Sequence, residues 1–296
     1  MPFRTRTDLL ALAGRYATER RVPAGTIAKE ILHYEILYAL LQSGAAAALT
    51  FQGGTALRLC YQGTRYSEDL DFVAGRAFDP TVMAPFEALL RREIANAYGL
   101  EVEIRTPAKD AAPSDVHVAR WSARVQMPQA DRSVPQGQVI HIEVANVPAH
   151  DPDLVAVSAN YPHLPEPLRQ MIVTAETPRE ILADKMVALG ARPYIKARDV
   201  WDIKFLTDRQ LTPDMALIGR KLIDYGWTVP SYKDRLRERL ALLSQPETAK
   251  AFHAEMTRFV DAGVASQIAN PALAAQFLRR AETLAQKVLD ADLAVA

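Results

Sequence analysis

A pair of glycines followed by two alternating carboxylates, all within residues 50–73, constrains this chain of 296 residues more than any other stretch. Gly53 and Gly54 follow a short apolar run and precede Thr55 and further apolar residues. This pattern is typical of a strand, a tight turn and the first turn of a helix. Such a helix start presents free backbone N–H groups to anions. The sequence therefore predicts a phosphate-binding turn at the glycine pair.

The two carboxylates belong to Asp69 and Asp71, which flank Leu70 and precede the apolar residues Phe72 and Val73. On a strand, this alternation puts both acids on one face, roughly 6.6 Å apart. That spacing suits one Mg²⁺ ion, or a pair of ions about 3.5–4 Å apart. A solvated polar face is the alternative interpretation. The apolar residues that follow favour a buried strand, whose acids need a cation or hydrogen-bond donors.

A third carboxylate, Glu143, lies in another predicted strand at residues 138–145. Its two neighbours in the sequence are apolar, so its side chain points to the opposite side of the strand from theirs. If this strand lies beside that of Asp69 and Asp71, the three acids would complete a metal site. Otherwise Glu143 is an exposed side chain.

Lys185 lies within the apolar stripe of a predicted helix, since Leu182, Met186 and Leu189 are its neighbours at helical spacing. An ammonium group in that position either meets an anion or reaches water along the edge of the stripe. The first case describes a phosphate-binding or acid–base lysine. The pattern leaves both cases open.

The residues that follow are dense in charge and begin another predicted helix: Arg192, Lys196, Arg198, Asp199 and Asp202. One interpretation is an exposed helix in which Arg198 pairs with Asp202, four residues away. The other is a group of cations that, together with Lys185, would bind a triphosphate.

Composition excludes several classes of protein. Lys plus Arg equals Asp plus Glu, at 35 each, so a site for a polyanion must be a local patch. The single Cys60 excludes an internal disulfide framework. No secretion signal or membrane-spanning segment is predicted, and we expect a cytoplasmic protein. No base neighbours Ser67, so a Ser-His-Asp hydrolase is not predicted.

We expect an α+β fold with a mixed α/β domain at residues 1–176 and a helical domain at 177–296. Further strands are predicted at 49–52, 100–105 and 116–127. The proline-rich stretch 146–178 is interpreted as a surface connection. Thr177 and Pro178 mark the start of the first helix of the second domain, with Gly190 as its stop. Later helices are predicted at 197–207, 213–225, 231–243, 248–262 and 272–292.

From about residue 30 to residue 206, the chain resembles the AbiEii/MenT family of nucleotidyltransferase toxins, in the DNA polymerase beta-like nucleotidyltransferase superfamily. The residues that carry this resemblance follow in order: Gly53-Gly54-Thr55-Ala56-Leu57, Arg65-x-Ser67-x-Asp69-Leu70-Asp71-Phe72, Ile142-Glu143-Val144, Lys185-x-x-Ala188-Leu189-x-x-Arg192 and Arg198-Asp199-x-x-Asp202. One position departs from the family pattern, because Gln52 stands where relatives often carry Lys.

The resemblance implies a nucleotidyltransferase-type mixed sheet with flanking helices, and an enzyme that transfers a nucleotide from an NTP. In characterised relatives the nucleotide is added to the 3′ end of tRNA, and this addition blocks translation. The partner of these relatives is an AbiEi-like antitoxin. Acceptors of other kinds, a small-molecule or protein hydroxyl, stay open. So does a non-catalytic binding protein of the same fold.

The resemblance also implies a role for each matching residue. Asp69 and Asp71 would bind Mg²⁺, with Glu143 as the third acid. The triphosphate site would be lined by Gly53, Gly54, Thr55 and Ser67. Lys185 would neutralise phosphate. The helical domain would complete the second half of the site, with the residues Arg192, Arg198, Asp199 and Asp202.

Overall fold

The computed structural model describes residues 8–107, 116–127 and 137–293. These residues form two compact units. The first contains Met1–Gln62 and Tyr66–Ala175, and the second contains Gly63–Arg65 and Glu176–Ala296. The predicted α+β class is confirmed, with a mixed sheet in the first unit and helices in the second. No helix in the described part of the chain combines the length and the apolar character needed to cross a membrane.

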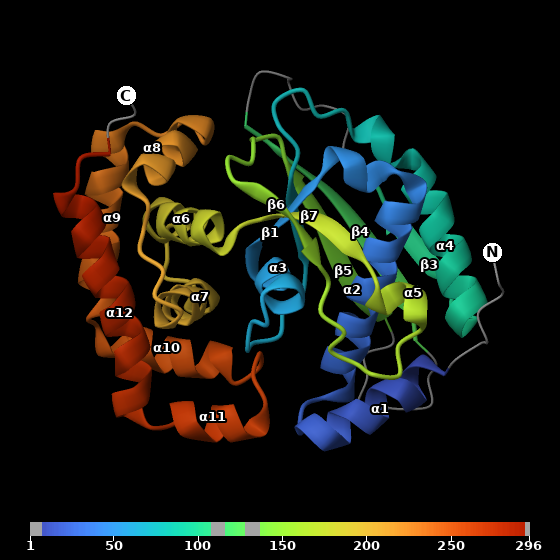
Figure 1. Ribbon diagram of the computed structural model, residues 1–296. Coiled ribbons are helices and arrows are strands. Elements are labelled where there is room, and N and C mark those ends of the chain that lie inside the picture. The colour runs from blue at the N-terminus through green and yellow to red at the C-terminus, as the bar shows by residue number, and fades with distance from the viewer. Residues whose placement is uncertain (1–7, 108–115, 128–136, 294–296) are drawn as a thin grey trace. The chain divides into compact units, whose positions relative to one another are not determined.

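The first unit is built on a seven-stranded mixed sheet with the strand order β3-β4-β5-β2-β1-β7-β6 (Figure 1). The strands are β1 (Thr50–Gln52), β2 (Leu70–Val73), β3 (Val102–Arg105), β4 (Val118–Gln126), β5 (Gly137–Ala145), β6 (Pro152–Ala156) and β7 (Ile172–Glu176). β2 lies between β1, to which it is antiparallel, and β5, to which it is parallel. The strand that carries Asp71 is therefore in the interior of the sheet.

Helices pack on the sheet and on one another in the first unit. Their bounds are α1 (Leu9–Arg20), α2 (Ala24–Ser43), α3 (Gly53–Cys60), α4 (Ala84–Tyr98) and α5 (Glu166–Arg169), with 3₁₀ turns η1 (Ala45–Ala48) and η2 (Pro80–Met83). Alternate residues of β4 and β5 are buried. Trp121 on this buried face donates a hydrogen bond from its indole N–H to Glu87 of α4 (3.2 Å). α4 therefore covers the apolar face of the sheet.

α2 is buried over most of its surface, and its buried polar side chains have partners. Glu30 pairs with Arg58 of α3 at 3.0 Å, and Glu35 accepts a hydrogen bond from the Tyr98 hydroxyl at 2.7 Å. Burial lowers the pKa of His33 to about 4, so its ring is neutral at pH 7. His33 Nε2 lies 3.1 Å from the backbone carbonyl of Glu68, which fixes the chain just before Asp69.

The proline-rich stretch predicted as a surface connection instead contributes two strands, β6 and β7, and the short helix α5. β7 is parallel to β1, with Ala175 opposite Phe51. Most of the prolines lie before or between these elements, at Pro148, Pro162 and Pro165, or at the first residue of β6, Pro152, and Pro167 lies in the first turn of α5. Because prolines are tolerated there and strands this short give little alternation, the sequence pattern hid both strands.

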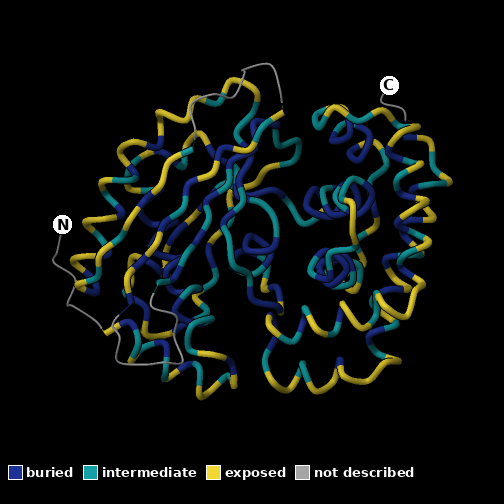
Figure 2. The backbone as a smooth tube through the Cα atoms, turned by 180° about the vertical axis from the view of Figure 1, so that it is seen from behind, coloured by how far each residue is buried: buried dark blue, intermediate teal, exposed yellow. Residues whose placement is uncertain are grey.

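The second unit is helical: α6 (Pro178–Ala191), α7 (Ala197–Asp208), α8 (Met215–Asp224), α9 (Val229–Leu243), α10 (Pro246–Met256), α11 (Ala262–Ile268) and α12 (Pro271–Asp290). α6 contacts α7, α8 and α9, and its residues are mostly buried (Figure 2). The predicted helix 248–262 is wrong. It is divided into α10 and α11, and the Asp261 side chain caps α11 by accepting the Val264 N–H at 3.0 Å.

α6 begins as predicted, with Thr177 as its N-cap and Pro178 in its first turn. Gly190 is not its stop, because the helix continues to Ala191. Gly190 instead gives room to the ring of Tyr232, since a Cβ atom there would lie 2.4 Å from Tyr232 Cε2. The Tyr232 hydroxyl donates to the Met186 carbonyl at 2.6 Å, which holds the ring in place.

We predict that Gly190→Ala lowers the free energy of unfolding by about 1–3 kcal/mol, because overpacking of a buried ring forces side-chain and backbone shifts. Denaturant unfolding measures the change. Gly14→Ala in α1 is the matched control, since a Cβ there meets no atom within 4 Å. It should leave stability unchanged or raise it by about 0.4–1 kcal/mol. Equal stability of the two variants would contradict this account.

Candidate active site

The middle of the sheet presents one polar face. Gln52 of β1 pairs with Asp71 of β2, and Asp71 pairs with Glu143 of β5. Paired residues on adjacent strands point to the same side, so these three side chains form a row across three strands. The neighbouring residues Phe72 and Val144 are buried on the other side. The half-buried acids therefore lie above an apolar layer that fixes their strands.

The glycine turn brings the backbone against this row. Gly53 begins α3 with a φ of +76°, and a Cβ atom there would lie 2.7 Å from Asp71 Oδ2. The Thr55 hydroxyl donates to the backbone carbonyl of Asp69. Asp69 Oδ1 accepts the backbone N–H of His141 of β5 at 3.2 Å. The start of α3 and both aspartates thus form one tightly packed group.

Other residues predicted for the phosphate site lie around this group. Gly54 and Thr55 are buried in the first turn of α3. Ser67 is half-buried in the segment between α3 and β2. Gln52 is the N-cap of α3 and makes no side-chain capping hydrogen bond. The predicted order of strand, turn and helix start is therefore present at the glycines.

The structure brings β5 beside β2, but the Glu143 carboxylate is engaged by Arg120 of β4 at 2.7 Å. Asp69, Asp71 and Glu143 do not form a compact trio. Within the part of the chain that the structure describes, one acidic group has ligand atoms within 4.8 Å of one another, and it lies in the second unit.

A Ser–His contact lies on the same polar face and was missed by sequence reasoning. Ser122 of β4 is opposite His141 of β5, and its hydroxyl lies 2.9 Å from His141 Nδ1. His141 precedes Glu143 by two residues, so the alternation of the strand already puts it on this face, but its partner Ser122 lies on another strand and carries no local signal. Asp69 contacts the backbone of His141 rather than its ring. These contacts do not make a Ser-His-Asp relay.

In the second unit, Lys185 of α6 is 9% exposed and meets two carboxylates. Its Nζ atom lies 2.8 Å from Asp199 Oδ1 and 2.9 Å from Asp202 Oδ2, both on α7. The interpretation in which this lysine reaches water along the stripe edge is therefore wrong. Burial alone would lower the pKa of Lys185. The charges of Asp199 and Asp202 outweigh burial, so the pKa is raised above its ordinary value. The ammonium group is charged at pH 7.

Two arginines extend this charge cluster. Arg65 forms a two-pronged ion pair with Asp202, with both N···O distances 2.7 Å. Arg192 Nε lies 3.3 Å from Asp199 Oδ2. Burial alone would raise the pKa values of Asp199 and Asp202, but the surrounding cations lower both. Three cations face two carboxylates, so the cluster carries an excess positive charge.

Arg198 does not join this cluster. Its Nε atom lies 3.3 Å from Glu255 Oε1, and its guanidinium lies over the ring of Phe259 at 4.5 Å from the ring centroid. The predicted pair between Arg198 and Asp202 is therefore wrong. Asp202 is instead held by Arg65, which lies 137 residues earlier in the chain. The spacing of residues along a helix cannot predict a contact between residues so far apart in the sequence.

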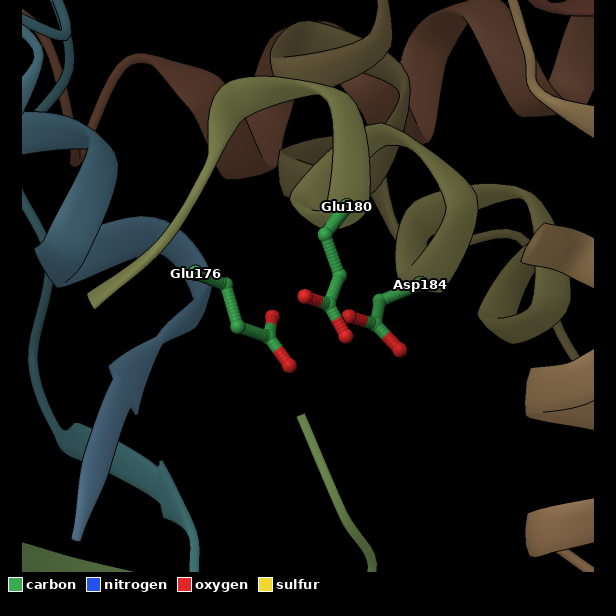
Figure 3. A group of neighbouring side chains, drawn as sticks. All are labelled: Glu176, Glu180 and Asp184. Atoms are coloured by element: carbon green, nitrogen blue, oxygen red, sulfur yellow. The ribbon is translucent and has the colours of Figure 1, made fainter. Parts of the chain in front are cut away.

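The compact acidic group consists of Glu176, Glu180 and Asp184, whose carboxylates point toward one another (Figure 3). Lys221 of α8 is fully buried among them, with its Nζ atom 2.7, 2.6 and 3.1 Å from their respective oxygens. Burial and the neighbouring Asp184 hold the pKa of Glu176 well above its usual range. The ammonium group already supplies the cation, so these acids form an internal ion cluster.

Comparison with known proteins identifies the family and shows the fold of the chain. A family model described as nucleotidyl transferase AbiEii toxin, type IV toxin–antitoxin system, matches residues 35–287. The fold is similar to that of MenT4, a nucleotidyltransferase toxin from Mycobacterium tuberculosis H37Rv, with a TM-score of 0.59 and 21% identity over 95% of this chain and 90% of that one. JHP933 from Helicobacter pylori has a TM-score of 0.50 and 18% identity over 89% and 91% of the two chains. No curated protein sequence matches the chain.

We predict that Lys185→Met lowers the free energy of unfolding by about 3–5 kcal/mol at pH 7, because it removes the one cation that contacts both buried carboxylates. The double variant Lys185→Met/Asp199→Asn should recover much of this loss, since Arg65 still pairs with Asp202. Denaturant unfolding of both variants measures the difference. A double variant no more stable than the single one would contradict the ion-pair account.

The loss should also depend on pH. The pKa values of Asp199 and Asp202 are lowered on folding, so their contribution to stability is complete above the unfolded pKa and is lost as pH falls toward the folded one. The stability gap between wild type and Lys185→Met should therefore narrow below about pH 4. Denaturant unfolding of both proteins at pH 7 and pH 3 measures this difference in stability. An equal difference at the two pH values would contradict the role of the ionised carboxylates.

Proposed function

Because the chain belongs to the AbiEii family of nucleotidyltransferase toxins of type IV toxin–antitoxin systems, we propose that it transfers a nucleotide from an NTP to the 3′ acceptor end of tRNA and so blocks translation. The observation that supports this most is the packing of Asp69 and Asp71 against the glycine turn at the start of α3. A helix start with free N–H groups suits phosphate oxygens, and the adjacent acids suit a divalent cation.

Mg²⁺ fits the residues on the polar face. Asp69 and Asp71 offer hard carboxylate oxygens, which Mg²⁺ prefers, and Gly53 leaves space beside Asp71 that a Cβ atom would fill. These two residues would hold the ion. Glu143 could join them only if its carboxylate turned away from Arg120. When bound, Mg²⁺ would offset charge on the phosphates and favour ionisation of the attacking hydroxyl.

The chain's own residues would bind and orient the two reactants. In the proposed reaction, the acceptor hydroxyl oxygen forms a bond to the α-phosphorus of the NTP. The bond from that phosphorus to the oxygen bridging to the β-phosphate breaks, and pyrophosphate leaves. The hydroxyl proton passes to a carboxylate of the polar face. Backbone N–H groups at Gly54 and Thr55 would donate hydrogen bonds to phosphate oxygens. Positioning and electrostatic stabilisation would then supply most of the rate acceleration.

We propose that the charge cluster of the second unit serves the same reaction. Lys185 has three N–H donors, and Asp199 and Asp202 account for two of them at hydrogen-bonding distances. The third donor can contact a phosphate oxygen, and Arg192 and Lys196 add positive charge nearby. Burial and the charge of Arg192 lower the pKa of Lys196. Asp199 and Asp202 would then position Lys185 rather than touch the substrate.

The family also implies a partner and a compartment. Type IV toxin–antitoxin membership implies a cognate antitoxin, which we propose is encoded beside this chain. Both proposed substrates, NTP and tRNA, are cytoplasmic, and we place the reaction in the cytoplasm.

We predict that Asp69→Asn and Asp71→Asn each lower the rate of nucleotide transfer by a factor of about 10³ or more, because loss of one metal-binding carboxylate removes transition-state stabilisation worth several kcal/mol. The measurement is incorporation of labelled nucleotide, with the fold checked by circular dichroism. Asp79→Asn is the matched control, because Asp79 is an exposed residue of the same unit and asparagine keeps its capping hydrogen bond to Thr81. Full activity in either of the first two variants would exclude the metal assignment.

The acceptor is tested by incubating the protein with each α-labelled NTP and total RNA, small metabolites or cell protein in turn. We expect label at the 3′ end of tRNA. Label in metabolites or protein alone would replace tRNA by another hydroxyl acceptor. Absence of transfer to all three, combined with no binding of Mg-NTP in calorimetry, would indicate a non-catalytic protein.

A further inference from the structure

A hollow of about 400 Å³ on the second unit is lined by five residues, each of which carries a hydrogen-bond donor in its side chain. Its lining residues are Lys204, Gln276, Arg279, Arg280 and Thr283. Lys204 comes from the C-terminal half of α7, and the other four come from α12. The α12 residues are spaced at i, i+3, i+4 and i+7, so they share one face of the helix. None of the five carries a carboxylate.

The two arginines of this hollow have no acidic partner. Arg279 and Arg280 are exposed, and neither forms an ion pair with another residue in the described part of the chain. On α9 of the same unit, half-buried Arg235 and exposed Arg237 instead pair with Glu238 and Asp234. Lys204 is balanced by Asp208 at 2.5 Å, so the net charge facing the hollow comes from the arginine pair.

We propose that this hollow, the α7/α12 basic hollow, binds the phosphate backbone of the acceptor RNA. Phosphate contacts need cations and other hydrogen-bond donors, whereas the core of a protein–protein interface is rich in large apolar and aromatic side chains. The aromatic ring that Lys204 contacts, Phe277, is already stacked on Trp201 with ring centroids 4.7 Å apart. The lining therefore favours RNA over an acidic protein.

The position of the hollow on α7 indicates which part of the RNA it would contact. Lys204 follows Asp202 by two residues, a rotation of about 200° around the helix, so the two side chains point to nearly opposite sides of α7. Asp202 faces Lys185, and Lys204 faces α12. Within the second unit, the hollow therefore lies on the side of α7 away from the Lys185 cluster, and it would contact RNA that lies outside that cluster. This inference rests on the proposed function in so far as RNA is the acceptor.

Binding of a fluorescein-labelled tRNA transcript to the full-length protein, without NTP, tests the proposal by fluorescence anisotropy. Arg279→Glu/Arg280→Glu should raise the dissociation constant about tenfold or more and make the slope of log K against log salt less negative by about 1–2. Arg279→Lys/Arg280→Lys should keep most of the affinity. Arg235→Glu/Arg237→Glu is the matched control, with the same change in net charge, and we expect it to change the dissociation constant less than about threefold.

Several results would overturn the proposal: unchanged affinity in Arg279→Glu/Arg280→Glu, an equal loss in the control pair, or an affinity for polyglutamate that depends on Arg279 and Arg280 while RNA affinity does not. Circular dichroism and thermal unfolding establish that each variant is folded. Nucleotide transfer to a short acceptor-stem RNA separates this inference from the proposed function. If the wild-type protein transfers nucleotide to RNA and Arg279→Glu/Arg280→Glu binds RNA normally, only the RNA-binding role of the hollow is refuted. If Arg279→Glu/Arg280→Glu loses RNA binding and the wild-type protein transfers nucleotide to no RNA, only the proposed transfer reaction is refuted.

Discussion

The missing side chain at Gly53 is the constraint on which the polar face of the sheet depends. A Cβ atom there would lie 2.7 Å from Asp71 Oδ2, so the start of α3 could not approach β2 this closely with any other residue. The close approach also lets the Thr55 hydroxyl reach the backbone of Asp69. One glycine thus joins a helix start, which attracts anions, to the start of β2, where Asp69 and Asp71 attract cations. Phosphate and metal together match both halves of this arrangement.

In the second unit, the arrangement of the helices depends on buried charged side chains. Asp184 and Lys185 are adjacent on α6 but belong to different clusters, the first around Lys221 and the second around Asp199 and Asp202. The Lys221 cluster holds three acids to one lysine, and burial together with the neighbouring Asp184 raises the pKa of Glu176. The Lys185 cluster holds more cations than acids. Only the second has positive charge to offer a phosphate, which is why we assign it to the substrate and the first to the fold.

The sequence predicted those features that depend on local spacing. The alternation of Asp69 and Asp71, the helix start at Thr177 and the strand of Glu143 are all set by neighbouring residues. The register that places Asp71 opposite Glu143 is set by pairing between strands about 70 residues apart, and no local pattern encodes it. The partner of Asp202 is Arg65, and that of Glu143 is Arg120. Such partners depend on the tertiary fold, so the spacing-based pair of Arg198 with Asp202 was wrong. β6 and β7 escaped prediction because short strands among prolines give too little alternation.

The chemical identity of the transferred group tests the central claim most directly. The protein would be incubated with tRNA and Mg²⁺ and with NTP labelled at either the α- or the γ-phosphate. Nucleotidyl transfer predicts that the α-label appears in tRNA and that the γ-label is released in pyrophosphate. The γ-label in tRNA, or its release as inorganic phosphate without incorporation of the α-label, would show phosphoryl transfer or hydrolysis and would contradict the assignment of this site.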